Sequence, residues 1–171
     1  GTHELMDWIW GFAVLQGANA APFDALGGLR GLRTLDVRLR QQTATAERLA
    51  ILFESEDSVT EVRHPSLASH PQFALAQKQL RHSGGLLTID LAGGFDAGKR
   101  FVESTQICQL ATSLGGPETL VTHPASTTHV NLLPDELAAA GITPGTVRIS
   151  AGLEATEDVA NDLLRALGST R

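Results

Sequence analysis

The feature that most constrains the fold of this 171-residue chain is an alternation of short apolar runs with helical patterns from residue 59 onward. Runs typical of strands lie at 59–62, 86–91, 107–114 and 146–153. Helical patterns lie between or after them, at 71–80, 95–104, 134–142 and around the stripe of Val159, Leu163 and Leu167. Such alternation produces a sheet covered by helices. We therefore expect an α/β fold (an α+β sandwich), with a small three- to four-stranded sheet and helices on one face.

The chain before residue 59 differs from the rest because its pattern is mainly helical. Residues 22–54 are expected to form one long helix, with Pro22 in its first turn and glycines that kink its first half. The opening segment holds Trp8 and Trp10, two large apolar side chains without an evident partner nearby. We therefore divide the chain into 1–58, an interdomain segment with a long kinked helix, and 59–171, an α/β domain.

Composition excludes several classes of protein. A content of 42% apolar and 19% charged residues is typical of a globular chain. No apolar stretch approaches the ~18 residues that span a bilayer, and the chain does not open like a signal peptide, so we expect no membrane partner. A net charge of −6 without a basic stripe argues against a nucleic-acid partner. The single cysteine, Cys108, fits a reducing compartment, and we expect a cytoplasmic protein.

Arg148 is the first candidate for a binding role. In the 146–153 strand, Val147 and Ile149 share one face, whereas Arg148 shares the other face with Ser150 and Gly152. A guanidinium beside such small residues leaves a surface on which a planar anion can lie, and arginine suits bidentate recognition of a carboxylate. From the spacing alone, an ion pair with a surface glutamate explains the same position equally well.

Ser113 is the second candidate, because it ends an apolar run just before Gly115 and Gly116. Ligands often bind where a strand opens into a loop, although an ordinary turn serine fits the same pattern. The histidine pairs, such as His64 and His70, lack metal-site spacing, and we expect no metal. The lysines, Lys78 and Lys99, lie in polar helical surroundings, unlike the desolvated setting of a Schiff-base nucleophile.

Several motifs together carry a resemblance to a known family. They are APFDALGGLRGLRTLDVRLRQQ (21–42), HPSLASHPQFALAQKQ (64–79), GGLLTIDLAGG (84–94), ATSLGGPETLVTHPASTTH (111–129) and AAAGITPGTVRISAGLEATEDVANDL (138–163). In this order they resemble the carboxy-terminal region of the Cys/Met-metabolism, or trans-sulfuration, enzymes that use pyridoxal 5′-phosphate. The family includes cystathionine γ-synthase, cystathionine γ-lyase, methionine γ-lyase and homoserine sulfhydrylases. The resemblance implies the C-terminal domain of a fold-type I pyridoxal-phosphate enzyme.

The resemblance also implies roles for particular residues. Arg148, in VRISAGLE, would clamp the α-carboxylate of an amino-acid substrate. Ser113, in SLGG, would assist through its side chain or the adjoining backbone, and Leu114 would line the same spot. Thr128, in HPASTTH, would lie near the substrate entrance. No residue of this chain is assigned a catalytic role.

The chain departs from the family in length, because family enzymes are more than twice as long. Their preceding domain carries the cofactor lysine and most phosphate contacts, and nothing here matches the lysine motif. The resemblance therefore implies a C-terminal piece, as an isolated domain, a cleavage product or a split half. Its expected partners are an N-terminal cofactor domain or a separate chain, and further copies of itself.

Two functions stay open at this stage. In the first, the chain is part of a lyase or transferase that eliminates or replaces a substituent of sulfur-containing or γ-activated amino acids. Such a chain would be inactive alone. In the second, it is a non-catalytic α/β interaction or amino-acid-binding domain that docks on a separate partner chain.

Overall fold

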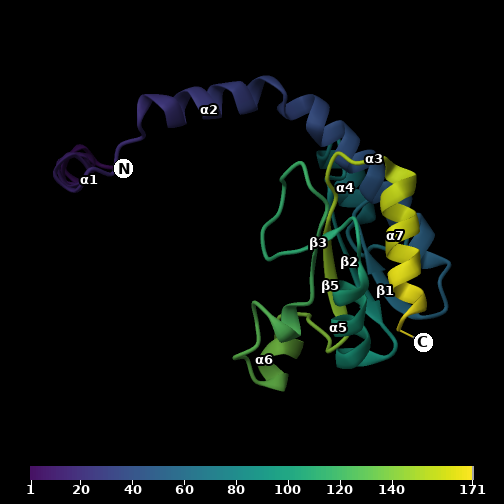
Figure 1. The fold of residues 1–171 in the computed structure, drawn as a ribbon. Coiled ribbons are helices and arrows are strands. Elements are labelled where there is room, and N and C mark those ends of the chain that lie inside the picture. Colours follow the sequence, from purple (N-terminus) through teal and green to yellow (C-terminus); the bar gives the residue numbers. More distant parts are fainter. Residues whose placement is uncertain (171) are drawn as a thin grey trace. The chain divides into compact units, whose positions relative to one another are not determined.

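The computed structural model describes residues 1–170 of the chain (Figure 1). Its helices are α1 (His3–Gln16), α2 (Pro22–Arg33), α3 (Leu35–Glu54), α4 (Phe73–Gln79), α5 (Gly94–Ser104), α6 (Pro134–Ala139), α7 (Thr156–Gly168) and the 3-10 helix η1 (Pro124–Ser126). Its strands are β1 (Val59–Arg63), β2 (Leu86–Leu91), β3 (Gln109–Leu110), β4 (Leu120–Thr122) and β5 (Thr146–Ser150). Within the described residues, no helix combines the length and apolar character needed to cross a membrane.

The chain divides into two compact units, of which the first is residues 1–36 and the second starts at Val37. The rest of α3 lies in the second unit because Leu49 and Phe53 are fully buried in its core. This division by compactness lies at residue 36, and the division at residue 58 suggested by the change of sequence pattern stays a prediction. The helix expected over 22–54 is interrupted at Thr34, which separates α2 from α3.

The sheet has five strands in the order β1-β2-β5-β4-β3, where three to four were expected. All neighbouring strands are antiparallel except β3 and β4, which are parallel. The additional strand is β4, whose three residues lie at the start of a polar, turn-rich segment and show no periodicity. Conversely, the apolar run at 107–114 contributes only the two residues of β3.

The hydrophobic core fills one face of the sheet, as the sequence predicted. Val62, Ile89 and Val147 are neighbours across β1, β2 and β5, and all three are buried. Helices α3, α5 and α7 pack against this face (Figure 1). Phe53 of α3 and Phe101 of α5 meet edge to face, with ring centroids 6.5 Å apart. Burial of a side chain of this size stabilises the fold by roughly 1.5–3 kcal/mol.

The opposite face of the sheet is polar. Strand register aligns Arg63, Thr88, Arg148 and Thr122 in one row across β1, β2, β5 and β4. Alternation along β5 explains the contrast, because Val147 and Ile149 point into the core while Arg148 points away from it. The fold thus holds Arg148 at the centre of a polar row.

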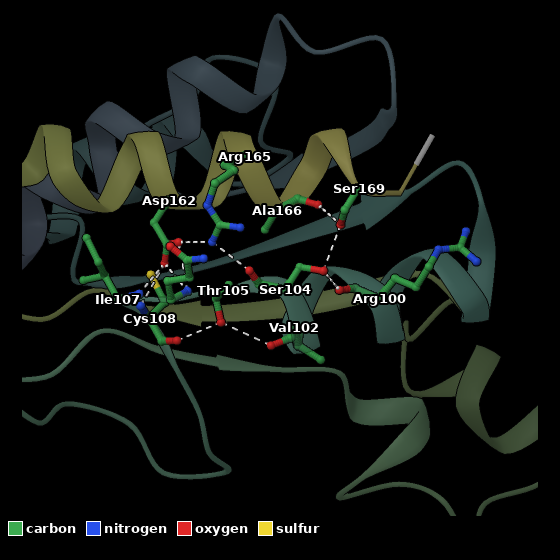
Figure 2. Close-up of polar contacts among 11 residues, drawn as sticks. Arg100, Val102, Ser104, Thr105, Ile107, Cys108, Asp162, Arg165, Ala166 and Ser169 are labelled. Atoms are coloured by element: carbon green, nitrogen blue, oxygen red, sulfur yellow. Dashed lines mark hydrogen bonds and ion pairs between the residues drawn. The ribbon is translucent and has the colours of Figure 1, made fainter.

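Asp162 of α7 fastens the chain between α5 and β3 (Figure 2). Its buried carboxylate accepts hydrogen bonds from the backbone N–H groups of Gln106 (2.9 Å), Ile107 (2.8 Å) and Cys108 (3.0 Å). The Arg165 guanidinium donates a further bond of 2.6 Å. Burial alone would raise the pKa of Asp162, but these donors outweigh it and hold the pKa at about 2.

Replacing Asp162 with asparagine is expected to lower the free energy of unfolding by about 2 kcal/mol at neutral pH. The folded-state pKa lies below the ordinary value of 3.8, so this stability is present above about pH 4 and is lost as pH falls toward 2. Urea unfolding at pH 7 and pH 3 measures it, with the exposed Asp158→Asn as a matched control. Equal stability of the Asp162→Asn and Asp158→Asn variants at pH 7 would contradict the expectation.

Candidate functional site

The candidate site is built around the Arg148 side chain, which is half-buried on the polar face of β5. Its Nη2 atom donates to the carbonyl oxygens of Thr112 (2.9 Å) and Ser113 (2.8 Å), and more weakly to Thr122 Oγ1 (3.4 Å). The Nε atom is buried and has no hydrogen-bond partner among residues 1–170. A buried unpaired donor costs roughly 1–3 kcal/mol, so an acceptor that reaches Nε gains this free energy.

Arg148 is not paired with an acid. Within residues 1–170 it forms no ion pair, whereas Arg63, in the same row, pairs with Asp90 and with Glu61 at 3.2 Å. The alternative of a strand arginine balanced by a surface glutamate is therefore wrong for Arg148. Its positive charge remains available to an anion from outside the described residues.

Ser113 lies beside Arg148, and Leu114 follows it in the loop formed by residues 112–119. Both residues are exposed, and their backbone N–H groups donate no hydrogen bond within the described part of the chain. The loop turns away from the sheet at Gly115, whose φ of 75° lies in the left-handed region that favours glycine. The structure thus brings the Ser113 backbone against Arg148 and leaves neighbouring donors open to solvent.

Two residues that the sequence did not single out for this purpose hold the 112–119 loop. Ser150, two positions after Arg148 on the same face, accepts a 2.9 Å bond from the Gly115 N–H. Gln42, buried on α3, donates a 2.8 Å bond to the Gly116 carbonyl. The period-2 alternation of the strand places Ser150 near Arg148. Gln42 is far away in sequence, and no local pattern reveals its partner.

Thr128 shares a cavity with Arg148. The cavity has a volume of about 260 Å³, and its lining includes Arg148, Thr122, Thr128 and His129. The exposed Thr128 hydroxyl lies 2.7 Å from His129 Nδ1. The predicted residues therefore approach Arg148 from two directions, with Thr128 across the cavity and Ser113 through its carbonyl. Leu114, which is 52% exposed, follows Ser113 in the loop.

Two other histidines are buried and fully used by local bonds. His64 Nδ1 lies 2.7 Å from Ser66 Oγ, and burial lowers the pKa of this imidazole below its usual value. His123 Nδ1 lies 2.9 Å from Ser126 Oγ, and its Nε2 lies 2.7 Å from the Pro144 carbonyl. These contacts brace loops and leave neither ring open to a ligand.

The lysines lie far from a desolvated setting. Lys99 is half-exposed on α5, with Nζ 4.0 Å from Glu103 Oε1, and Lys78 is exposed in the last turn of α4. The only cysteine, Cys108, is buried, and burial together with Asp162 raises the pKa of its thiol well above the usual value. The described residues therefore offer an arginine without an acidic partner, and no activated amine or thiol.

Comparison with known proteins identifies the family. The sequence model of one protein family, the Cys/Met metabolism PLP-dependent enzymes, matches residues 3–168. The chain belongs to this family. Trans-sulfuration proteins of this kind use pyridoxal 5′-phosphate, and a Campylobacter jejuni structure with a TM-score of 0.84 carries N′-pyridoxyl-lysine-5′-monophosphate. That structure shares 38% sequence identity with the chain and is matched over 90% of the chain and 37% of its own length.

Individual relatives of the chain differ in their reactions. An L-methionine gamma-lyase of Porphyromonas gingivalis is 43% identical over 155 residues, which cover 91% of the chain and 39% of the relative. A cystathionine beta-lyase of Coxiella burnetii is 42% identical over 88% of the chain and 39% of its own length. The cystathionine gamma synthase of Xanthomonas oryzae has been solved with aminoacrylate and cysteine and is 41% identical to the chain. It matches the chain with a TM-score of 0.87, over 99% of the chain and 44% of its own length. The chain thus spans about two fifths of these relatives' length.

Proposed function

We propose that this chain forms the substrate-side part of a pyridoxal-phosphate-dependent lyase or transferase. The complete enzyme would eliminate or replace a substituent of a sulfur-containing or γ-activated amino acid. The observation that carries the proposal is Arg148, whose Nη2 is anchored on two carbonyls while its buried Nε lacks a partner. A fixed guanidinium with an unpaired edge suits the carboxylate that all amino-acid substrates share.

In this proposal each site residue acts on the substrate. Arg148 binds the α-carboxylate and orients the rest of the molecule with respect to the α-carbon. Ser113 assists through its hydroxyl or the adjoining backbone, and Leu114 lines the same spot. Thr128 lies at the entrance, in the cavity that it shares with Arg148. Precise orientation matters because a misplaced reacting bond loses rate as well as affinity.

The residues of this chain do not fit the cofactor's attachment site. That site needs a lysine amine held away from water, and both lysines here are exposed to solvent. We therefore assign the lysine to a separate part of the complete enzyme, either the N-terminal cofactor domain or a partner chain. The location we propose for the assembled protein is the cytoplasm.

The exposed apolar side chains of helix α1 support the proposal that the first unit of the chain packs against a partner. Trp8, Trp10 and Phe12 are 75%, 70% and 66% exposed, and apolar side chains surround the helix on all sides. A helix with this character is normally buried. We propose that α1 packs against the cofactor-bearing part, within a homo-oligomer of the complete enzyme.

Treatment of the 171-residue chain with pyridoxal phosphate and sodium borohydride is expected to give no stoichiometric adduct on Lys78 or Lys99. Exposed amines outside a desolvated pocket bind the aldehyde weakly, so labelling should stay sparse and unselective. The chain alone should also release no thiol from methionine. Peptide mass spectrometry and a thiol assay measure these results, with the complete enzyme as control. Stoichiometric labelling of one lysine, or thiol release by the chain alone, would contradict the proposal. A complete enzyme without activity on any amino acid would favour the non-catalytic alternative.

A further inference from the structure

We infer that Glu154 is a positioning residue that sets the 112–119 loop with respect to Arg148. Glu154 ends the VRISAGLE motif, and it precedes α7 without touching the candidate site itself. Both of its carboxylate oxygens are used by one residue of the loop. Oε1 accepts from the Thr119 N–H at 2.7 Å, and Oε2 accepts from the Thr119 hydroxyl at 2.7 Å.

Thr119 also connects the loop to the segment that follows β5. Its side chain is fully buried, and its Oγ1 accepts a 2.9 Å bond from the Gly152 N–H. The next residue, Leu153, donates a 2.7 Å bond to the Pro117 carbonyl. A Cβ on Gly152 would lie 2.4 Å from Glu154 Oε2, the Pro117 carbonyl and the Thr119 nitrogen, so the segments 117–119 and 152–154 are packed without spare room.

The loop is therefore held at both ends by β5 and its continuation. At its start, Arg148 binds the carbonyls of Thr112 and Ser113. At its end, Glu154 binds Thr119, which is followed directly by β4. Ser113 and Leu114 lie between these two anchors, and the Ser150 contact to Gly115 and the Gln42 contact to Gly116 lie between them and Thr119. The position of Ser113 and Leu114 relative to the Arg148 guanidinium therefore depends on a series of contacts along the loop, and the Glu154 contact is the last of them.

Loss of the Glu154 carboxylate would leave the buried Thr119 N–H without its acceptor, and the end of the loop would have to move to find another. Movement at Thr119 shifts Ser113 and Leu114, and with them the spot where the substrate carboxylate is proposed to lie. The inference rests on the proposed function of Arg148. It adds that a residue outside the site controls affinity for the substrate.

The test uses the complete enzyme, loaded with cofactor, and compares Glu154→Ala with Glu157→Ala as a matched control. Glu157 is exposed near the start of α7, and within residues 1–170 it forms a surface ion pair of 3.2 Å with Arg48. We expect Glu154→Ala to raise KM for the amino-acid substrate about 10- to 100-fold, because two charge-assisted hydrogen bonds are lost. Glu157→Ala should leave KM unchanged. Hydrogen exchange should accelerate in a peptide covering 111–119 and stay constant in β2.

Two further variants make the outcome decisive. Glu154→Gln can still accept the Thr119 N–H bond, so its KM should rise only about two- to tenfold. If Glu154→Ala fails to fold, the Glu154→Gln variant decides, and an unchanged KM there overturns the inference. Arg148→Ala separates the proposed role of Arg148 in substrate binding from the inferred role of Glu154 in positioning the loop. If Arg148→Ala raises KM while Glu154→Ala does not, the inference alone is wrong. If Arg148→Ala leaves KM unchanged, the proposed function is wrong, and the role of Glu154 in substrate affinity falls with it.

Discussion

Replacement of Arg148 by alanine is expected to lower kcat/KM of the complete enzyme by about 30- to 5,000-fold. This range corresponds to ~2–5 kcal/mol, the cost of truncating one partner of a buried, hydrogen-bonded charge pair. Part of the loss should appear in kcat, because the carboxylate contact also orients the reacting bond. Steady-state kinetics over a range of substrate concentration separates the two contributions.

Arg148→Lys is the companion variant, and it should not restore activity. Lysine keeps the charge but cannot hold two carbonyls on one nitrogen and present a second donor in the same plane. Stability should change little in either variant, by about 1 kcal/mol or less, because the bonds of Arg148 are partly solvated. A near-normal kcat/KM together with a large fall in Tm would show instead that Arg148 serves the fold, and the site assignment would be wrong.

Gly98→Ala is expected to be a strongly damaging substitution, with a loss of about 2–3 kcal/mol in the free energy of unfolding. A Cβ at Gly98 of α5 would lie 2.5 Å from Cδ2 and 2.6 Å from Nε2 of His123. The His123 ring is fully buried and fixed at both nitrogens by Ser126 and the Pro144 carbonyl. It therefore cannot move aside without breaking one of these bonds.

The matched control for this variant is Gly27→Ala in α2. No heavy atom lies within 4 Å of a Cβ at Gly27, so alanine there should gain up to about 1 kcal/mol from its higher helix propensity. The same substitution in two helices should thus have opposite signs. Denaturant unfolding monitored by circular dichroism measures both variants. A Gly98→Ala variant as stable as the parent chain would show that His123 has an alternative position.

Local sequence patterns correctly predicted the helices and strands that have a clear apolar pattern or lie between glycines. The run at 86–91 matches β2 because glycine pairs lie on both sides of a mostly apolar strand. The stripe of Val159, Leu163 and Leu167 identified the buried face of α7. The run at 107–114 misled, because its second half leaves the sheet and its carbonyls at Thr112 and Ser113 bind Arg148 instead of a neighbouring strand. A three-residue strand such as β4 has too little length for any periodicity to show.

The candidate site followed the same division between local and long-range information. Alternation within one strand was enough to place Arg148 on the polar face, and the family resemblance added Ser113, Leu114 and Thr128 to it. Neither source revealed that Gln42 and Glu154 hold the 112–119 loop. These contacts join residues that are distant along the chain, and only the packed structure specifies them.

The two edges of the sheet have a consequence for how copies of this chain could aggregate. A long, flat edge strand invites another chain to pair with its backbone, which is the route to fibrils. Here one edge is β3, which is only two residues long. The other edge is β1, whose pairing register shifts between Val59 and Glu61 and whose side chains include the charged Glu61 and Arg63. Neither edge offers a template for strand addition, so contacts between copies have to be formed by side-chain surfaces. We therefore expect the sheet to resist fibril formation at concentrations at which a long, flat edge strand would nucleate it.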